Sequence, residues 1–218
     1  MAVKIINIFT DVLEENEKIA ASNREIFEKN NVFAVNLMSA PGAGKTSLIE
    51  KTIDFLKNSI KIAVLEGDIT SSIDSERLEK YHIPVIQINT GGECHLNAYM
   101  VSEALPHFKF NDIDLLIIEN VGNLVCPAEF KVGEDMKVMI LSVPEGHDKP
   151  KKYPLMFRES RVLIINKIDL KDFCDTDLEV LKKNALEINP SLEIFEVSCK
   201  TGAGIEEWSN FLVRKIKS

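Results

Sequence analysis

The sequence predicts an α/β fold in which helices cover both faces of a doubly wound, mostly parallel sheet. Short runs rich in Val, Ile and Leu recur along the 218 residues, and helical patterns alternate with them. Each run is apolar along its whole length, which is typical of strands that are covered on both faces. The predicted strands are Val32–Met38, Lys61–Glu66, Pro84–Ile88, Ile113–Glu119, Lys137–Val143, Val162–Asn166 and Leu192–Val197.

A helix is predicted at the start of the chain. Between Ile8 and Asn30, apolar residues recur at helical spacing among many charges, which indicates an amphipathic helix packed on the main domain. We therefore divide the chain into an N-terminal helix over residues 1–30 and one large domain over residues 31–218. Further helical patterns cover Ser47–Asn58, Asp175–Ile188 and Ile205–Ile216.

Composition excludes several classes of protein. The chain has 26 basic and 34 acidic residues, a net charge of −8, which argues against non-specific nucleic-acid binding but not against a nucleotide ligand. Apolar runs are too short to span a membrane, and no signal-peptide pattern opens the chain. The four cysteines are too few for a disulfide-rich fold. We expect a soluble, cytoplasmic protein with reduced thiols and with neither nucleic acid nor membrane as a partner.

A phosphate-binding loop follows the first predicted strand. The sequence Ser39-Ala40-Pro41-Gly42-Ala43-Gly44-Lys45-Thr46 matches a P-loop that opens a helix, except that Ser39 replaces the usual first Gly. Backbone amides of such a loop surround phosphate oxygens at a helix N-terminus. Lys45 is expected to bridge the β- and γ-phosphates and Thr46 to bind Mg²⁺. The residues predicted to hold the phosphates are Gly42, Ala43, Gly44, Lys45, Thr46 and Ser47.

Two later segments predict guanine as the base. Asn166-Lys167-Ile168-Asp169 ends the sixth strand, and the Asp169 carboxylate can accept hydrogen bonds from the N1–H and 2-amino groups that adenine lacks. Such a pocket rejects adenine by about three to five orders of magnitude. Ser198-Cys199-Lys200 resembles the Ser-Ala-Lys loop that contacts the guanine oxygen in GTPases, and Cys199 there is interpreted as a small apolar residue without a redox role.

Acidic residues at two strand ends predict a magnesium site and a GTPase. Glu119 ends the fourth strand and is expected to hold Mg²⁺ through a water, while the amide of Gly122 senses the γ-phosphate. Asp68 follows the second strand and is a candidate for Mg²⁺ binding or for positioning the attacking water, with a helix cap as the alternative. Lys45 and Asp68 are therefore the predicted catalytic residues for hydrolysis of GTP to GDP and phosphate.

Cysteine and histidine residues predict a second metal site. Cys94 and His95 follow the third strand, and Cys126 lies four residues past Gly122. Two thiolates and an imidazole suit Zn²⁺ or Ni²⁺, although spacing alone also fits buried thiols without a metal. Cys126 lies on the segment expected to move with the γ-phosphate, so nucleotide state can change the metal geometry.

In combination these motifs resemble the HypB family of hydrogenase nickel-incorporation GTPases over nearly the whole chain. They include Gly91-Gly92-Glu93-Cys94-His95-Leu96-Asn97-Ala98 and Glu119-Asn120-Val121-Gly122-Asn123-Leu124-Val125-Cys126-Pro127. The resemblance implies a dimerising, signal-recognition-like P-loop GTPase whose homodimer depends on the nucleotide. It also implies a metallochaperone that assists nickel insertion into the [NiFe]-hydrogenase large-subunit precursor together with a partner nickel chaperone. Cys94, His95 and Cys126 match the family's metal ligands at the dimer interface.

Other functions remain open from the sequence alone. A urease-accessory nickel GTPase usually has a Cys-x-His pattern, whereas Cys94 and His95 are adjacent. A metal-binding scaffold in which GTP only sets conformation is a second alternative, and a nucleotide kinase is disfavoured because it would lack the Asn166–Asp169 motif. His147 is a candidate accessory ligand. Lys149, Lys151 and Lys152 are interpreted either as a solvated basic loop or as a dimer contact.

Overall fold

The computed structural model describes residues 8–68 and 77–217. The opening segment Met1–Ile6, on which the expectation of no signal peptide depends, lies outside these ranges. So do Ile69 and Thr70, which follow the candidate residue Asp68, and the last residue of the predicted main domain, Ser218.

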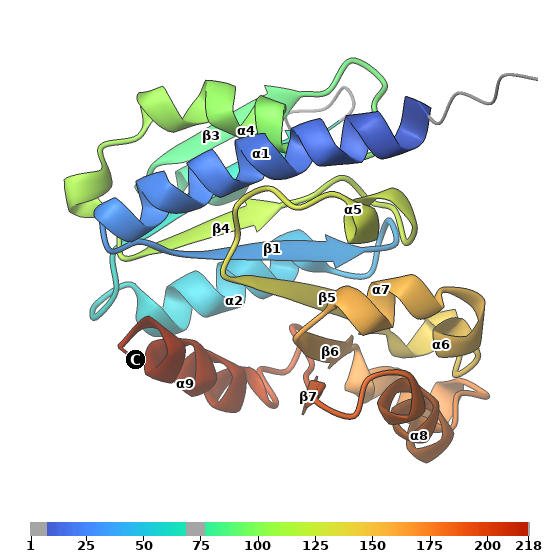
Figure 1. The fold of residues 1–218 in the computed structure, drawn as a ribbon. Coiled ribbons are helices and arrows are strands. Elements are labelled where there is room, and N and C mark those ends of the chain that lie inside the picture. The colour runs from blue at the N-terminus through green and yellow to red at the C-terminus, as the bar shows by residue number, and fades with distance from the viewer. Residues whose placement is uncertain (1–7, 69–76, 218) are drawn as a thin grey trace, which may run out of the picture.

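Within the described ranges, a parallel sheet of seven strands forms the centre of the molecule, in the order β3-β2-β4-β1-β5-β6-β7 (Figure 1). All seven predicted strands are confirmed, with ends shifted by a few residues. The fourth begins late because Phe110–Asp112 forms a 3-10 turn in which the Ile113 N–H donates to the Phe110 carbonyl. The strands are β1 Phe33–Ser39, β2 Ile62–Asp68, β3 Val85–Asn89, β4 Leu115–Glu119, β5 Met136–Ser142, β6 Val162–Asn166 and β7 Glu193–Glu196.

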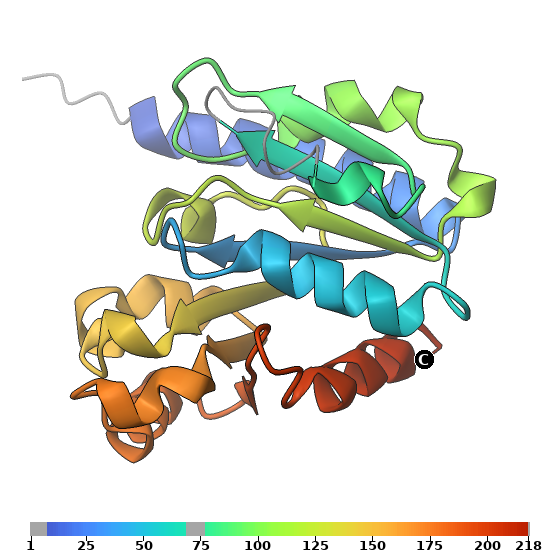
Figure 2. The same cartoon turned by 180° about the vertical axis from the view of Figure 1, so that it is seen from behind.

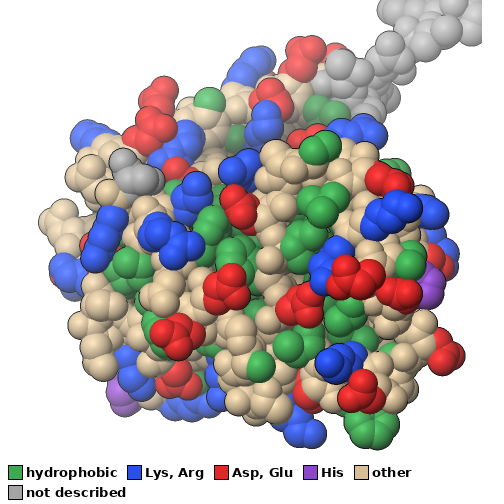
Figure 3. Space-filling model, turned by 90° about the horizontal axis from the view of Figure 1, so that it is seen from below, with side chains coloured by type: hydrophobic (Ala, Val, Ile, Leu, Met, Phe, Trp, Pro, Cys, Tyr) green, Lys and Arg blue, Asp and Glu red, His purple; other side chains and the backbone are tan. Residues whose placement is uncertain are grey.

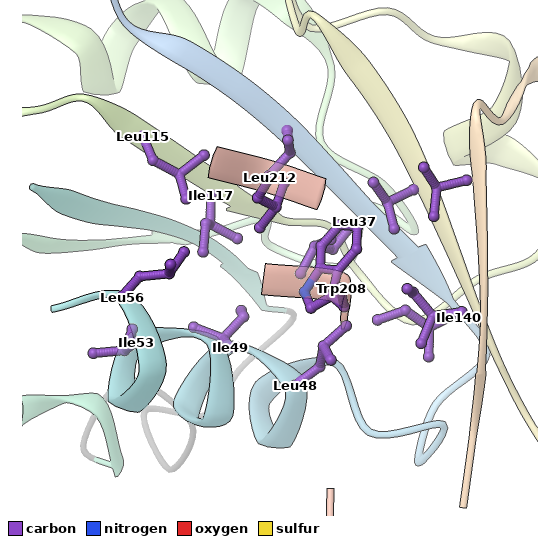
Figure 4. Close-up of a cluster of buried hydrophobic side chains, with 14 of the residues drawn as sticks. Leu37, Leu48, Ile49, Ile53, Leu56, Leu115, Ile117, Ile140, Trp208 and Leu212 are labelled. Atoms are coloured by element: carbon purple, nitrogen blue, oxygen red, sulfur yellow. The ribbon is translucent and has the colours of Figure 1, made fainter. Parts of the chain in front are cut away.

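One face of the sheet is covered by α2, Lys45–Leu56, and α9, Ile205–Ile216, which lie side by side (Figure 2). Trp208 of α9 is almost fully buried between α2 and the strands, and its indole N–H donates to Thr52 Oγ1 over 3.1 Å (Figure 4). Residues at alternate strand positions point into this cluster, as parallel strands covered on both faces require.

The other face is covered by α1, Ile8–Lys29, α4, Ala98–Ala104, and a group of shorter helices (Figure 1). The predicted N-terminal helix is thus present and packs against α4. Asn23 holds it there, because its buried amide donates to the carbonyls of Ala98 and Val132 over 2.9 and 3.1 Å. Further helices are α5 Cys126–Glu129, α6 Lys149–Lys152, α7 Pro154–Glu159 and α8 Leu178–Ile188. The division into residues 1–30 and 31–218 stays a prediction.

The shorter helices were not predicted from helical periodicity in the sequence. The helices α4, α5 and α7 have too few turns to produce a clear pattern. The interpretation of Lys149–Lys152 as a loop is wrong in its local structure, because these residues form the helical turn α6 with Pro150 near its start. Pro is compatible with the first turn of a helix, where its missing N–H has no partner to lose.

The surface carries mixed charge on the face seen in Figure 3. There Lys and Arg side chains are interspersed with Asp and Glu, and hydrophobic side chains are scattered among them. Across residues 8–68 and 77–217, no helix has the length and apolar character needed to cross a membrane.

Candidate functional site

A pocket of 440 Å³ opens where the loops after β1, β6 and β7 meet. It unites three segments that are far apart in the sequence: the P-loop, the Asn166–Asp169 motif and the Ser198–Lys200 loop. Ligands of open parallel sheets bind at this carboxyl edge of the strands. Its lining residues are Gly44, Ser47, Glu50, Lys51, Asn166, Lys167, Asp169, Leu170, Cys199 and Lys200.

Asn166 and Lys167 brace the phosphate-binding loop. The Asn166 amide donates to the Ala43 carbonyl over 2.9 Å, and the Lys167 ammonium donates to the Gly42 carbonyl over 2.8 Å. Gly44 has a φ of +106°, and a Cβ at this position would clash with Asn166 Nδ2. Glycine is therefore required there for two reasons, the positive φ and the close approach of Asn166.

Asp169 and Cys199, which the sequence places in the guanine-reading segments, both line the pocket. Asp169 Oδ1 accepts a hydrogen bond from the Ser198 hydroxyl over 2.5 Å, and Asn166 Oδ1 accepts one from the Cys199 N–H over 3.3 Å. Burial raises the pKa of the Cys199 thiol to about 11. A thiol with that pKa stays neutral near pH 7, which agrees with its interpretation as a small apolar residue.

Lys45 and Ser39 interact inside the P-loop. The Lys45 ammonium donates to Ser39 Oγ over 3.3 Å, while the Ser39 hydroxyl donates to the Ala40 carbonyl. Ser39, which replaces the usual glycine, is fully buried. Its hydroxyl is a neutral hydrogen-bond acceptor for Lys45, so the Lys45 ammonium can exchange this bond for stronger ones to charged phosphate oxygens.

Thr46 and Glu119 form the oxygen-donor pair expected for Mg²⁺. Both are buried, and the Thr46 hydroxyl donates to Glu119 Oε1 over 2.9 Å. A hydroxyl and a carboxylate are the hard donors that Mg²⁺ prefers, so these residues fit the ion. Asp68 ends β2 beside β4 and is half-buried. Its role at a metal stays a prediction.

Glu66 is a buried carboxylate for which the sequence motifs predicted no role. It is 2% exposed and pairs in register with Glu119 across β2 and β4. Its position two residues before Asp68 was the available signal, since alternate residues of a strand share a face.

Gly122 lies against the P-loop. A Cβ at this position would come within 2.9 Å of the Pro41 ring and 3.1 Å of the Pro41 backbone. The segment after β4 therefore touches the loop that is expected to hold the γ-phosphate, and only glycine allows that contact.

Cys94, His95 and Cys126 converge at the same edge of the sheet. One ligand atom from each lies within 4.8 Å of the others, and the two sulfurs are 3.2 Å apart. Burial lowers the pKa of the His95 imidazole and raises that of the Cys126 thiol, which the hydrogen bond with Cys94 raises further. A neutral imidazole beside two thiols is a donor set for Zn²⁺ or Ni²⁺ once the thiols lose their protons.

Metal affinity at this cluster is expected to rise steeply with pH. Because metal binding displaces the thiol protons, the dissociation constant for Zn²⁺ should fall by up to about 100-fold per pH unit below the thiol pKa values. The raised pKa of Cys126 extends this dependence above the ordinary thiol range, whereas His95, with its lowered pKa, is already neutral. Competition titrations between about pH 7 and 8 measure it, and a constant affinity there would rule out thiol ligands.

Comparison with known proteins shows the family to which this chain belongs. The family model described as "CobW/HypB/UreG, nucleotide-binding domain" matches residues 33–196. The probable hydrogenase maturation factor HypB of Methanocaldococcus jannaschii is 41% identical over 215 residues, which are 99% of this chain and 97% of the relative. The chain belongs to the HypB family.

Solved structures agree with this assignment. The crystal structure of HypB from Helicobacter pylori in complex with nickel is 38% identical, with a TM-score of 0.89, and the match covers 93% of this chain and 95% of the other. The signal recognition particle receptor FtsY from Elizabethkingia anophelis shares the fold at 15% identity, with a TM-score of 0.52 over 84% of this chain and 65% of that one. The predictions of the family, of the α/β fold and of the P-loop GTPase class are therefore confirmed.

Within this HypB-family chain, His147 lies in a different loop cluster. Its Nδ1 accepts a hydrogen bond from the Asp177 N–H over 3.2 Å, and its carbonyl accepts one from the Asn184 amide. His147 thus holds the start of α8 and lies outside the cluster formed by Cys94, His95 and Cys126.

Two of the three lysines of α6 have partners close by in the chain. Lys152 pairs with Asp148 over 2.5 Å, and Lys149 lies over the Tyr153 ring. These contacts give both residues structural partners within α6 and its flanks, and a role in a dimer contact stays a prediction.

Proposed function

We propose that this protein is a GTP-hydrolysing metallochaperone that assists nickel insertion during [NiFe]-hydrogenase maturation. The observation that carries the proposal is the presence, at one edge of the sheet, of a P-loop pocket and a Cys–His–Cys cluster in a HypB-family chain. The names of its relatives support the process, since they are hydrogenase maturation factors, and one of them was crystallised with nickel.

Hydrolysis is proposed to proceed by in-line attack of water on the γ-phosphate of GTP. Lys45 leaves Ser39 and neutralises charge on the β- and γ-phosphates, and the Gly42–Ser47 amides bind their oxygens. Thr46 and Glu119 would hold Mg²⁺, which supplies further charge neutralisation at the phosphates.

Asp68 is the proposed second acid of the hydrolytic site. It is the last residue of β2, and β2 pairs directly with the strand that ends in Glu119. From this position its carboxylate would bind Mg²⁺ together with Glu119 or orient the attacking water.

The cluster is proposed to carry Ni²⁺ or Zn²⁺ between protein partners. Cys94, His95 and Cys126 offer three donors, one fewer than a closed tetrahedral site needs. A water molecule or a second copy of the chain would supply the remaining ligand. This open coordination suits a metal that must be received and released. A second copy of the chain at the open position would make the protein a homodimer, and we propose that formation of this dimer depends on the nucleotide. The proposed partners are a nickel chaperone that delivers the metal and the hydrogenase large-subunit precursor that receives it.

Replacing Cys126 by alanine is expected to weaken metal binding and leave GDP binding nearly unchanged. Loss of one thiolate from three donors should raise the dissociation constant for Ni²⁺ or Zn²⁺ by at least about 10-fold. Equilibrium titration with each metal measures this change, and Cys174→Ala is the matched control because Cys174 lies outside the cluster. Unchanged affinity and stoichiometry in Cys126→Ala would remove that ligand from the proposal.

The proposed function is tested first by measuring metal affinity with GDP and with a non-hydrolysable GTP analogue, together with oligomer mass. We expect the affinity and the mass to differ between the two nucleotide states. Identical metal affinity and oligomer mass with GDP and with the GTP analogue would contradict coupling between the nucleotide pocket and the metal cluster. The cluster would then be a structural site. Phosphate release from GTP separates an enzyme from the alternative scaffold, because absence of turnover in the saturated dimer would contradict hydrolysis.

A further inference from the structure

Asn120 connects the nucleotide pocket to the metal cluster. It follows Glu119 directly, precedes Gly122 by two residues and is 0% exposed. Its side-chain oxygen accepts hydrogen bonds from the N–H groups of Leu96 and Val121, over 2.9 and 3.0 Å. Leu96 is the residue after His95. The Asn120 side-chain oxygen therefore joins the segment that carries Cys94 and His95 to the segment 119–122.

The other half of the Asn120 amide fixes its orientation. Its Nδ2 donates to Asn36 Oδ1 on β1 over 3.1 Å, and its backbone N–H donates to the Leu37 carbonyl over 3.0 Å. Asn36 is fully buried. The amide is therefore held on β1, and it cannot rotate without leaving buried polar groups without partners, which is costly.

The segment that carries Cys94 and His95 is held to the nucleotide side at both ends. At its start, the Thr90 N–H donates to the Asp68 carbonyl over 2.9 Å. At its end, the Leu96 side chain packs so closely on Gly67 that a Cβ there would lie 2.5 Å from Leu96 Cγ. The two acids expected at Mg²⁺ therefore lie beside contacts to this segment. Asp68 itself accepts the hydrogen bond from Thr90, and Glu119 is followed directly by Asn120, which accepts the one from Leu96.

We propose that Asn120 is a positioning residue that makes Cys94 and His95 follow the segment 119–122. Cys126 lies four residues after Gly122 in the chain. A displacement of the segment 119–122 would therefore move all three metal ligands together. This inference rests on the proposed function and adds the link through which nucleotide state would set the geometry of the metal site. A shared hydrogen-bonded element that both sites bias is the physical requirement for such coupling.

The measurement is the ratio of metal dissociation constants with GDP and with a non-hydrolysable GTP analogue, for Ni²⁺ and Zn²⁺ separately. Couplings between sites are commonly about 5- to 150-fold. In Asn120→Ala the ratio should fall below about twofold while GDP affinity stays within about threefold of the wild type. Asn184→Ala is the matched control, because it also removes a buried asparagine amide, one that donates to the His147 carbonyl and contacts neither Asn120 nor Leu96.

The outcomes separate the two proposals. A wild-type ratio of one contradicts the coupling in the proposed function. A wild-type ratio above one that persists in Asn120→Ala overturns the role of Asn120 alone, and an equal loss in Asn184→Ala overturns it in favour of a general structural effect.

Hydrogen exchange of the wild-type protein tests the same link without a variant that could fail to fold. The amides of Leu96 and Val121 share one acceptor, so their exchange rates should change together when GDP is replaced by the GTP analogue. A change at Val121 with none at Leu96 would overturn the proposal.

Discussion

Replacement of Asp169 by asparagine is expected to change the base preference of the pocket from guanine towards xanthine. The carboxylate of Asp169 only accepts hydrogen bonds, as the N1–H and 2-amino groups of guanine require. An asparagine amide would instead place donors beside the 2-amino group. Xanthine has a carbonyl at that position and can accept them.

The expected effect is large because the pocket would leave buried polar groups mismatched. Sites built to hydrogen-bond a ligand reject unmatched analogues by about 10⁴- to 10⁵-fold, and we expect GTP affinity in Asp169→Asn to fall by at least about 100-fold. Competition of GTP, XTP and ATP for the pocket measures the change.

Asp172→Asn is the control for this experiment. Asp172 lies on the same 3-10 helix, Ile168–Phe173, and is exposed. The Asp172→Asn substitution removes the same negative charge and should leave the base preference of the pocket unaltered. If GTP and ATP compete equally in the wild type, or if Asp169→Asn keeps its preference for GTP, the assignment of the base-reading residue is wrong.

Replacement of Lys45 by alanine is expected to abolish GTP turnover. The ammonium of Lys45 is the predicted cation at the β- and γ-phosphates, where charge must be neutralised in the transition state. Removing one preorganised donor of this kind costs about 10²- to 10³-fold in rate, and loss of a full charge should cost at least as much. Phosphate release under saturating GTP and GDP binding are the two measurements.

Lys57→Ala serves as the control, because Lys57 caps the other end of the same helix and pairs at the surface with Asp54. It removes one positive charge from the end of α2 without touching the pocket. Unchanged turnover in Lys45→Ala would remove the P-loop assignment.

Much of the nucleotide site could be predicted because its motifs are local. The P-loop is a continuous run of residues whose glycines, lysine and threonine each have a role tied to their spacing. The seven strands were also found from local composition, since strands buried on both faces are apolar throughout. Their ends, and the helices of two turns or fewer, needed the structure.

The surroundings of Asn120, Glu66 and Ser39 could not be predicted, because they depend on burial or on a neighbour that is distant in sequence. Asn120 accepts a hydrogen bond from Leu96, 24 positions away, and Glu66 lies in register with Glu119 on a neighbouring strand. His147 shows the opposite case: a residue type suited to metal binding lies where its ring accepts a hydrogen bond from Asp177.

The fold class, the P-loop, the guanine motif and the resemblance to the HypB family all follow from the order of the amino acids, because each is a local pattern or a succession of local patterns along the chain. The folded chain was needed to establish that Cys94, His95 and Cys126 meet within 4.8 Å and that one buried amide joins them to the nucleotide edge. Parallel strands bring their carboxyl ends to one edge regardless of their order in the chain, so residues that follow β3 and β4 become neighbours only when the sheet forms.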